Sequence, residues 1–357
     1  MTNKNDVISE RYQILEHIGS GGMQDVFLAN DHLLGLSVAL KTPQPGQAQK
    51  RFKNSAIIAA KINNHNIAKT LDYIEENGKF FLIEEFVEGE TLDSKLKKFG
   101  FLDPHLAAHV LHHLAKGILA SHRAGVIHRD LKPSNIITSH GVNLYDLKIT
   151  DFGIATLTEE VFEDAHRKGD LTNSTSGTIK GALPFMAPEM MFRNVGDQTG
   201  MPVDIWSLGA MMFLILTGEY PFGLYLEAAV NVKTRNRKPW PHFMTVNPQF
   251  KPLAQELQRI VDMCLSYEPE NRPSAIQLVK MCQDLCYLGT EREEGIVTNL
   301  IQNGRSGFAE TENKGVFFSM ESVYGPSAPH PMTNNKICFS SFPGNPKERA
   351  HPILFIK

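Results

Sequence analysis

A glycine-rich segment and a lysine near the N-terminus could together bind phosphate. Residues 19–26 read Gly-Ser-Gly-Gly-Met-Gln-Asp-Val and lie between two strand-like runs, where glycines let backbone amides approach an anion closely. Such a segment alone is more often a simple turn. The next strand-like run ends on Lys41, a costly residue at the end of an apolar strand unless it meets an anion. The spacing therefore predicts a hairpin that covers phosphates, with a lysine from the following strand, and not a P-loop, in which the lysine directly follows the glycines.

Seven short motifs follow one another in a fixed order. They are GSGGMQDV at 19–26, VALK at 38–41, HRDLKPSN at 128–135, DFG at 151–153, MAPE at 186–189, DIWSLG at 204–209 and ENRPS at 270–274. On these motifs the chain resembles the eukaryotic-like Ser/Thr protein kinases of the bacterial-type subfamily, over roughly residues 11–288. The resemblance implies an α+β fold with a small β-rich N-lobe and a larger α-helical C-lobe. It also implies transfer of the ATP γ-phosphate to Ser/Thr hydroxyls of a protein substrate, with ATP and Mg²⁺ as cofactors.

The resemblance assigns roles to five polar residues. Asp130 would accept the proton of the substrate hydroxyl, and Lys132 and Lys41 would contact the phosphates. Asn135 and Asp151 would supply oxygen ligands to Mg²⁺. The alternative, that Asp130 is only a structural acid in a loop, is weakened by this set of neighbours.

A nucleotide-binding set drawn from both lobes also follows from the resemblance. Its members are Gly19, Gly21, Gly22, Val26, Ala39, Lys41, Glu84, Glu85, Val87 and Ile137. Val26 and Ala39 would lie above the adenine and Ile137 below it, and backbone groups of residues 85–87 would form its hydrogen bonds. Two further pairs are expected to be scaffold: Glu189 with Arg272 as an ion pair, and Asp204 with Trp206 as anchors of the central helix.

Four positions depart from the family pattern. Gln24 replaces the third glycine of the loop, at the least demanding of the three positions. Ser55 stands where an active kinase has the helix glutamate that pairs with the strand lysine, and residues 50–63 contain no acid. Glu84 falls at the gatekeeper position, so we hypothesise that it pairs with Lys41 in place of the missing glutamate. A strand register that differs by one would instead turn Glu84 to solvent. Ala182 replaces a threonine that bridges the catalytic residues in many relatives.

The chain divides into three parts by composition and by the spacing of its apolar residues. Residues 1–9 are polar and expected to be flexible, and residues 10–288 form the kinase domain, with an N-lobe at about 10–87 and a C-lobe at about 88–288. Strands are predicted at 12–18, 25–30, 37–41, 69–74 and 79–87, and helices at about 50–63, 104–124, 203–216, 252–266 and 274–288. Residues 289–357 are a C-terminal extension of unknown fold, either an extended tail or an appendage on the helical lobe.

Composition limits the function classes. The chain has 357 residues, 42% of them hydrophobic, and a net charge of −3, which gives no bulk electrostatic footprint for nucleic acid. Four cysteines are too few for a disulfide scaffold and favour a reducing, cytoplasmic setting. The most apolar stretch, residues 209–217, is too short to span a membrane, and the first residues lack the apolar core of a signal peptide.

Several further features allow more than one interpretation. Residues 172–178 hold a cluster of serines and threonines that autophosphorylation could order, or that could simply be a solvated loop. His105, His109 and His113 share a helix face that could bind a metal but reads better as solvated, and Cys282 and Cys286 are expected to pack as small apolar groups. Two rival functions remain: a pseudokinase that binds nucleotide weakly, and a kinase whose residues 289–357 dock a partner.

Overall fold

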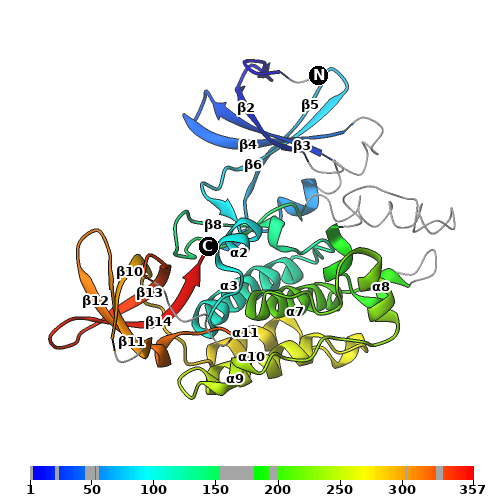
Figure 1. Cartoon of the computed structure of the whole chain (residues 1–357). Helices are drawn as coiled ribbons and strands as arrows, with labels where there is room; N and C mark the ends of the chain where they lie inside the picture. Colours follow the sequence, from blue (N-terminus) through cyan, green and yellow to red (C-terminus); the bar gives the residue numbers. More distant parts are fainter. Residues whose placement is uncertain are drawn as a thin grey trace.

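In the computed structural model the chain forms two lobes and a separate C-terminal barrel (Figure 1). The structure describes residues 3–20, 24–44, 53, 56–152, 181–192, 199–301, 304–326 and 333–357. The N-lobe is a sheet, the C-lobe is mainly helical, and the barrel packs beside the C-lobe. The predicted α+β fold with a β-rich N-lobe and a helical C-lobe is confirmed.

The N-lobe is a six-stranded sheet in the order β1-β2-β3-β4-β6-β5. Its strands are β1 (Val7–Ile8), β2 (Tyr12–Ser20), β3 (Gln24–Asp31), β4 (Leu36–Pro43), β5 (Thr70–Glu76) and β6 (Lys79–Glu85). Alternating side chains give the sheet one apolar face, because successive residues of a strand point to opposite sides. That face forms the N-lobe core and includes Ile14, Phe27, Leu40 and Ile83, all buried. The opposite face is left for the candidate site.

The C-lobe is built around two long helices. Its elements are β7 (Glu90–Thr91), α2 (Leu92–Phe99), α3 (Pro104–Arg123), η1 (Pro133–Asn135), β8 (Ile136–Thr138), β9 (Lys148–Ile149), η3 (Leu183–Phe185), α6 (Pro188–Met191), α7 (Pro202–Thr217), α8 (Tyr225–Lys233), α9 (Phe243–Val246), α10 (Lys251–Cys264), η4 (Pro269–Asn271) and α11 (Ala275–Gln283). Helix α3 begins where the Asp103 carboxylate accepts backbone N–H bonds and Pro104 occupies the first helical position. Helix α7 is apolar on nearly all sides and buried, and it ends at Gly218 in the left-handed conformation.

Residues 293–356 close into a five-stranded barrel in the order β10-β11-β12-β14-β13. Its elements are β10 (Glu293–Ile301), β11 (Ser306–Glu310), β12 (Gly315–Ser319), η6 (Met320–Ser322), β13 (Lys336–Phe342) and β14 (Arg349–Ile356). Strands β12 and β14 run parallel, and the other neighbours are antiparallel. A small apolar core of its own, with Val316, Phe318 and Phe339 at its centre, lets the barrel form a distinct body. The C-terminal extension is therefore an appendage on the helical lobe.

The barrel is fixed to the C-lobe by a buried ion pair and an aromatic contact. The Arg292 guanidinium lies 3.0 Å from the Asp103 carboxylate, and both side chains are almost completely buried. Tyr324 packs its ring within 5.9 Å of Phe101 and 5.2 Å of Phe250. The last residue of the chain also donates its backbone N–H to Lys98 of α2 at 3.0 Å. In Figure 1 the C-terminus accordingly lies close to α2.

Some details differ from the sequence predictions. The prediction of a flexible segment over residues 1–9 is wrong for Val7 and Ile8, which pair with β2, because Ile8 is buried in the N-lobe core. Helix α11 is shorter than predicted and ends at Gln283. Residues 56–59 are helical and residues 60–63 are not, so the helix expected at 50–63 ends earlier than predicted. Residues 50–52, 54 and 55 lie outside the described residues. Cys286 is exposed and does not pack like Cys282.

Candidate active site

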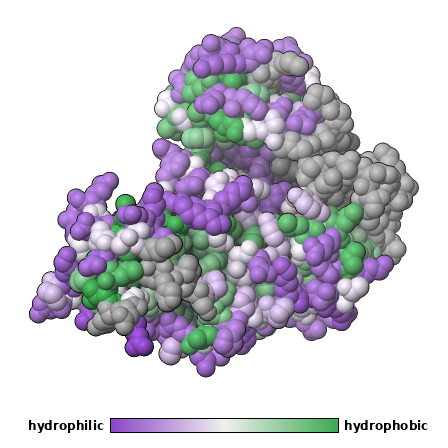
Figure 2. Space-filling view, in the orientation of Figure 1, coloured by the Kyte–Doolittle hydropathy of each residue, from purple (hydrophilic) through white to green (hydrophobic). Residues whose placement is uncertain are grey.

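One face of the N-lobe sheet presents the residues predicted to bind nucleotide. The register pairs Val26 with Lys41 across β3 and β4, and Ala39 with Glu84 across β4 and β6. Residues directly opposite each other in a sheet point to the same side. Gln24, the first residue of β3, has the same parity as Val26 and shares that face. The surface is hollowed between the two lobes, beneath this sheet (Figure 2).

Lys41 binds two carboxylates at once. Its Nζ donates to Glu84 Oε2 at 2.5 Å and to Asp151 Oδ1 at 2.8 Å. Glu84 is only 3% exposed. A register in which Glu84 faces solvent is therefore wrong, and the predicted Lys41–Glu84 contact is present. Ser55 lies outside the described residues.

Burial and charge act against each other in this cluster. Burial disfavours the charged amine of Lys41, but the carboxylates of Asp151 and Glu84 outweigh that cost and raise its pKa. Burial raises the pKa of Glu84, and Lys41 offsets the increase only in part. For Asp151 the balance is reversed: burial is outweighed by Lys41, and the pKa of Asp151 is lowered. Lys41 therefore stays protonated, and of its two partners Asp151 holds its charge more firmly.

A second polar cluster surrounds Asp130 at the start of the catalytic motif. Lys132 Nζ lies 3.0 Å and 2.8 Å from the two carboxylate oxygens of Asp130. Asn135 donates its Nδ2 to the Asp130 backbone oxygen at 2.8 Å and to its Oδ2 at 3.1 Å. The motif thus brings together Asp130, Lys132 and Asn135, as predicted. Ala182, which replaces the expected threonine, is buried in the C-lobe core and cannot donate a side-chain hydrogen bond.

The loop that carries Asp130 is held by the central helix α7. The Asp204 carboxylate accepts backbone N–H bonds from His128 at 2.9 Å and from Arg129 at 2.8 Å. His122 contacts the same carboxylate through Nε2 at 2.9 Å. These bonds fix a strained stretch of backbone, since Arg129 has a φ of +61°. The expected anchoring role of Asp204 is thus seen as direct contacts, and Trp206 stacks on Phe222 beside it.

The predicted hinge joins the two lobes. Glu85 is the last residue of β6, and its backbone N–H donates to the Lys69 backbone oxygen at 2.8 Å. Its carboxylate forms an ion pair with Lys148, also at 2.8 Å. Val87, two residues after β6, and Ile137, in β8, are both half-buried. Gly19 lies in β2 opposite Val26. Gly21 and Gly22 lie outside the described residues.

The residues present fit a magnesium site of the predicted kind. Asn135 commits its amide nitrogen to Asp130, which leaves its side-chain oxygen as the group able to face a cation. Thr150 lies between Asn135 and the next candidate ligand: its Oγ1 is 3.2 Å from the Asn135 backbone oxygen and 3.2 Å from Asp151 Oδ2, and its single hydroxyl hydrogen can be donated to either. In the described part of the chain no group of three His, Cys, Asp or Glu side chains could hold a metal alone. The amide oxygen of Asn135 and the carboxylate of Asp151 are hard oxygen ligands of the kind that Mg²⁺ would take, and phosphate and water would complete its shell.

Two other expectations concern residues away from this site. Glu189 binds Arg272 through two contacts of 2.6 Å and 2.9 Å, as the predicted scaffold pair. The histidines of α3 do not form a solvated face, because they pack against neighbouring segments; His109, for example, contacts the Leu144 backbone oxygen at 3.1 Å. The serine and threonine cluster at 172–178 lies outside the described residues.

Sequence reasoning discounted one residue that the structure places in the site. Gln24 is 4% exposed and donates its Nε2 to Asp151 Oδ1 at 2.8 Å. Its position in the sequence could have indicated a role in the site, because a long polar side chain replaces a glycine where phosphates are expected to lie.

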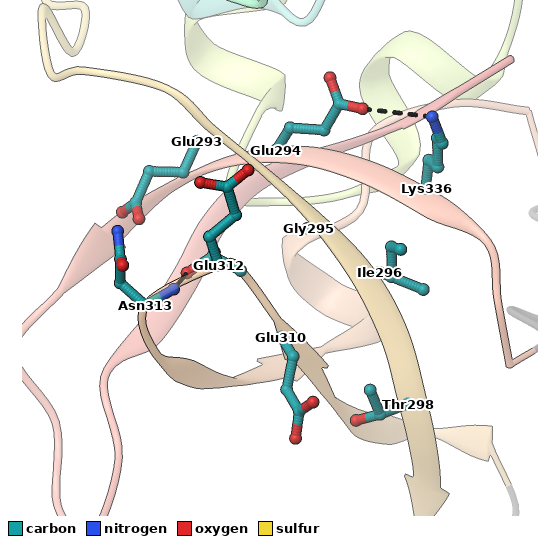
Figure 3. Close-up of a pocket in the computed structure, with 10 residues that line it drawn as sticks. Glu293, Glu294, Gly295, Ile296, Thr298, Glu310, Glu312, Asn313 and Lys336 are labelled. Atoms are coloured by element: carbon teal, nitrogen blue, oxygen red, sulfur yellow. Dashed lines mark hydrogen bonds and ion pairs between the residues drawn. The ribbon is translucent and has the colours of Figure 1, made fainter.

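A hollow of about 810 Å³ lies on the barrel (Figure 3). Most of its charges are compensated: Glu293 binds Lys314 at 2.9 Å, and Glu294 binds Lys98 at 2.9 Å and Lys336 at 3.6 Å. None of the predicted site residues lines it. It belongs to the barrel and is separate from the site between the lobes.

Residues 12–282 match the protein kinase domain family. The chain is 31% identical over 271 residues to the serine/threonine-protein kinase PrkC of Bacillus subtilis, covering 74% of this chain and 39% of that protein. It is 34% identical over 224 residues both to the probable serine/threonine-protein kinase pknA2 of Bifidobacterium longum and to the serine/threonine-protein kinase pkn2 of Myxococcus xanthus, covering 60% of this chain and 28% and 25% of those proteins. The chain therefore belongs to the protein kinase family, and the predicted resemblance to bacterial-type Ser/Thr kinases is confirmed.

The match is confined to part of each relative. The chain spans about two fifths of the length of PrkC and less of the other two relatives. In the part of the chain that the structure describes, no helix has the length and apolar character needed to cross a membrane.

Proposed function

We propose that this chain is a Ser/Thr protein kinase that transfers the γ-phosphate of ATP to hydroxyl groups of a protein substrate. The observation that carries the proposal is the meeting of two clusters, Lys41 with Asp151 and Asp130 with Lys132 and Asn135, next to one another between the lobes. Phosphoryl transfer requires mainly that the reacting groups be positioned and that the negative charge of the phosphates be neutralised. The side chains of these two clusters can do both. Mg²⁺, when bound, would neutralise phosphate charge.

Each charged residue then has a part in the reaction. Asp130 orients the substrate hydroxyl and accepts its proton, while Lys132, 2.8 Å from that carboxylate, neutralises charge on the transferred group. Lys41 holds the phosphates from the N-lobe side. Asn135 and Asp151 direct oxygen atoms to the metal. Asp204 keeps the Asp130 loop in place through the backbone bonds described above.

We also propose that Glu84 serves as the partner that orients Lys41. A buried carboxylate costs free energy unless it is paired, and Lys41 is the partner within reach. Glu84 and Asp151 hold the ammonium from two sides, which restricts it to one position on the sheet face. The relocation of this ion pair from a helix to β6 would let the chain keep an oriented lysine with Ser55 in the helix.

Incorporation of radiolabelled phosphate from ATP tests this function. The intact chain is expected to label itself or a general protein substrate, and Asp130→Asn to lose that labelling while it keeps its fold by circular dichroism. Equal labelling by both proteins would remove Asp130 from catalysis. Mass spectrometry of the labelled chain is expected to place phosphate among Thr172, Ser174, Thr175, Ser176 and Thr178, and their absence from the labelled peptides would contradict autophosphorylation of this loop.

A pseudokinase remains the second candidate, and one observation favours it. Asp151, the proposed metal ligand, already accepts hydrogen bonds from both Lys41 and Gln24. A protein that binds nucleotide without transfer would show nucleotide affinity but no labelling in either variant. Residues 289–357 would then act mainly by docking a partner, and removal of the barrel would abolish partner binding without changing nucleotide affinity.

We propose a reducing, cytoplasmic setting and no nucleic-acid ligand. All four cysteines lie in the described residues and are free thiols. Three of them are buried, where burial raises the pKa of the thiol, to about 12 for Cys282 and Cys338. Such thiols are unreactive and need no disulfide to stabilise the fold. The near-neutral net charge of −3 supports the expectation that the chain does not bind nucleic acid.

A further inference from the structure

The side chain of Gln24 connects the two lobes across the candidate site. It leaves the first residue of β3 in the N-lobe and donates Nε2 to Asp151 Oδ1, 2.8 Å away, on the segment that follows β9. Only 4% of Gln24 is exposed. A glycine at this position, as in the family pattern, would make no such contact and would leave the space open to phosphate oxygens.

The contact occupies an oxygen that the proposed metal site needs. Asp151 Oδ1 accepts from Lys41 Nζ at 2.8 Å as well as from Gln24, and Oδ2 accepts from Thr150 Oγ1 at 3.2 Å. A carboxylate oxygen that already accepts two N–H bonds has little capacity left for a cation, because its lone pairs are engaged and the donors carry partial positive charge. Two of the three donors, the Gln24 amide and the Thr150 hydroxyl, are neutral, and Gln24 is the one of these two that binds Oδ1, from a long side chain at the start of a strand.

We propose that Gln24 is a positioning residue that holds Asp151 against the glycine-rich strand, and that its amide competes with the metal of a metal–nucleotide complex for Asp151 Oδ1. The inference rests on the proposed nucleotide site. Binding of the complex requires Gln24 to release Asp151, so the bond lowers the affinity for metal–nucleotide. The same bond links the two lobes and stabilises their contact when no nucleotide is bound.

Packing alone does not account for this residue. Gln24 lies on the site face of the sheet, opposite the apolar core that contains Phe27 and Leu40. An apolar side chain of the same size would fill the space equally well, whereas an amide buried there needs a hydrogen-bond partner. The partner that it has is the charged oxygen of Asp151, and bonds to charged groups are the stronger ones.

Two variants separate the hydrogen bond from the volume of the side chain. Gln24→Ala removes both, and Gln24→Leu removes the amide but keeps most of the volume. The affinities of Mg²⁺·ADP are measured by calorimetry for both variants and the unchanged chain, and again for ADP in the presence of EDTA. Thermal unfolding without nucleotide gives a readout that is independent of binding.

Both variants are expected to bind Mg²⁺·ADP about 10- to 100-fold more tightly than the unchanged chain, the effect of losing one hydrogen bond to a charged group. The gain should disappear in EDTA, because the competition is with the metal. The melting temperature without nucleotide should fall by about 2–4 °C in both. Equal affinities in all three proteins would overturn the competition, and so would a gain in Gln24→Ala alone, since that result assigns the effect to volume.

The outcomes also distinguish this inference from the proposed function. If none of the three proteins binds Mg²⁺·ADP or ADP, the nucleotide site itself is wrong and the role of Gln24 with it. If all bind equally, the nucleotide site stands and the role of Gln24 alone is overturned. Tighter binding by both variants, limited to the samples with Mg²⁺, supports both.

Discussion

Lys41 and Glu84 form a buried ion pair in which the ammonium and the carboxylate are 2.5 Å apart, on neighbouring strands of one sheet. The pair places a carboxylate where the family usually has an apolar side chain. Burial raises the pKa of Glu84, which means that its charged form costs free energy in this position. The pairing with Lys41 offsets part of that cost.

Glu84→Gln is therefore expected to lower the rate of phosphate transfer about 10- to 100-fold. The variant keeps an oxygen that can accept from Lys41 but loses the charge that holds the ammonium, an interaction of about 1.5–3 kcal/mol. Glu84→Met, which removes the acceptor as well, should lower the rate at least as much. The rate is measured with the radiolabelled-ATP assay at saturating nucleotide.

A control for this experiment is Glu85→Gln, which alters the neighbouring acid whose partner is Lys148 at the hinge. That ion pair is partly exposed and should contribute little. Full activity in Glu84→Met would show that Lys41 needs no partner on β6.

The ion pair between Arg292 and Asp103 predicts how firmly the barrel is held. Arg292→Met should lower the free energy of unfolding by about 3–5 kcal/mol, because it leaves the carboxylate at the start of α3 buried without its cation. Urea unfolding followed by tryptophan fluorescence measures the change. Lys98→Met, which breaks a partly exposed pair with Glu294 on the same interface, should cost less than about 1 kcal/mol. A similar loss in both variants would mean that Arg292 contributes no more than a surface pair.

Gly89, between the hinge and α2, is expected to tolerate no side chain. A Cβ there would lie 2.1 Å from the Thr138 backbone oxygen, and the residue has a φ of +155°. Gly89→Ala should cost about 2–4 kcal/mol through strain and displacement of β8. Gly78→Ala is the matched control: its φ is also positive, at +73°, but nothing lies within 4 Å of the added carbon. Equal stabilities of the two variants in urea would contradict the steric argument.

Much of the kinase domain could be predicted because its signals are local. The run 37–41 is a short apolar stretch that ends on a lysine, and Asp103-Pro104 marks the start of α3, so β4 and α3 appear where expected. The catalytic motif places Asp130, Lys132 and Asn135 within five residues, and such proximity along the chain makes their contact in space almost unavoidable.

The remaining features depend on contacts between distant segments. Gln24 and Asp151 are 127 residues apart, and only the packing of the N-lobe against the C-lobe brings them together. The barrel went unrecognised for a similar reason, because its closure depends on the pairing of β10 with β13, whose paired residues lie 40 or more positions apart in the chain. Arg292 pairs with Asp103, which lies 189 residues away, and nothing in the sequence around either residue indicates this ion pair.

His113 on α3 predicts a loss of stability in mild acid. Burial, together with the nearby His109 and Lys116, lowers the pKa of His113 to about 4. Its Nδ1 faces the Asn66 amide nitrogen at 3.1 Å, and the same amide nitrogen donates to the Leu147 backbone oxygen at 2.9 Å, so the amide is fixed and the histidine must accept. Protonation of His113 would place its Nδ1–H donor directly against the Asn66 amide, which is also a donor.

The direction of the pH effect follows from proton binding. Between about pH 6.5 and 4 the unfolded chain binds a proton at His113 and the folded chain does not, so stability falls as the pH is lowered through this range. After allowance for partial exposure, the loss at pH 5 is about 1 kcal/mol from this residue. The free energy of unfolding of His113→Asn should therefore decrease less between pH 7.5 and 5 than that of the unchanged chain. His32→Asn, at an exposed turn of the N-lobe, should follow the unchanged chain; a parallel decrease in all three proteins would show that His113 does not carry the effect.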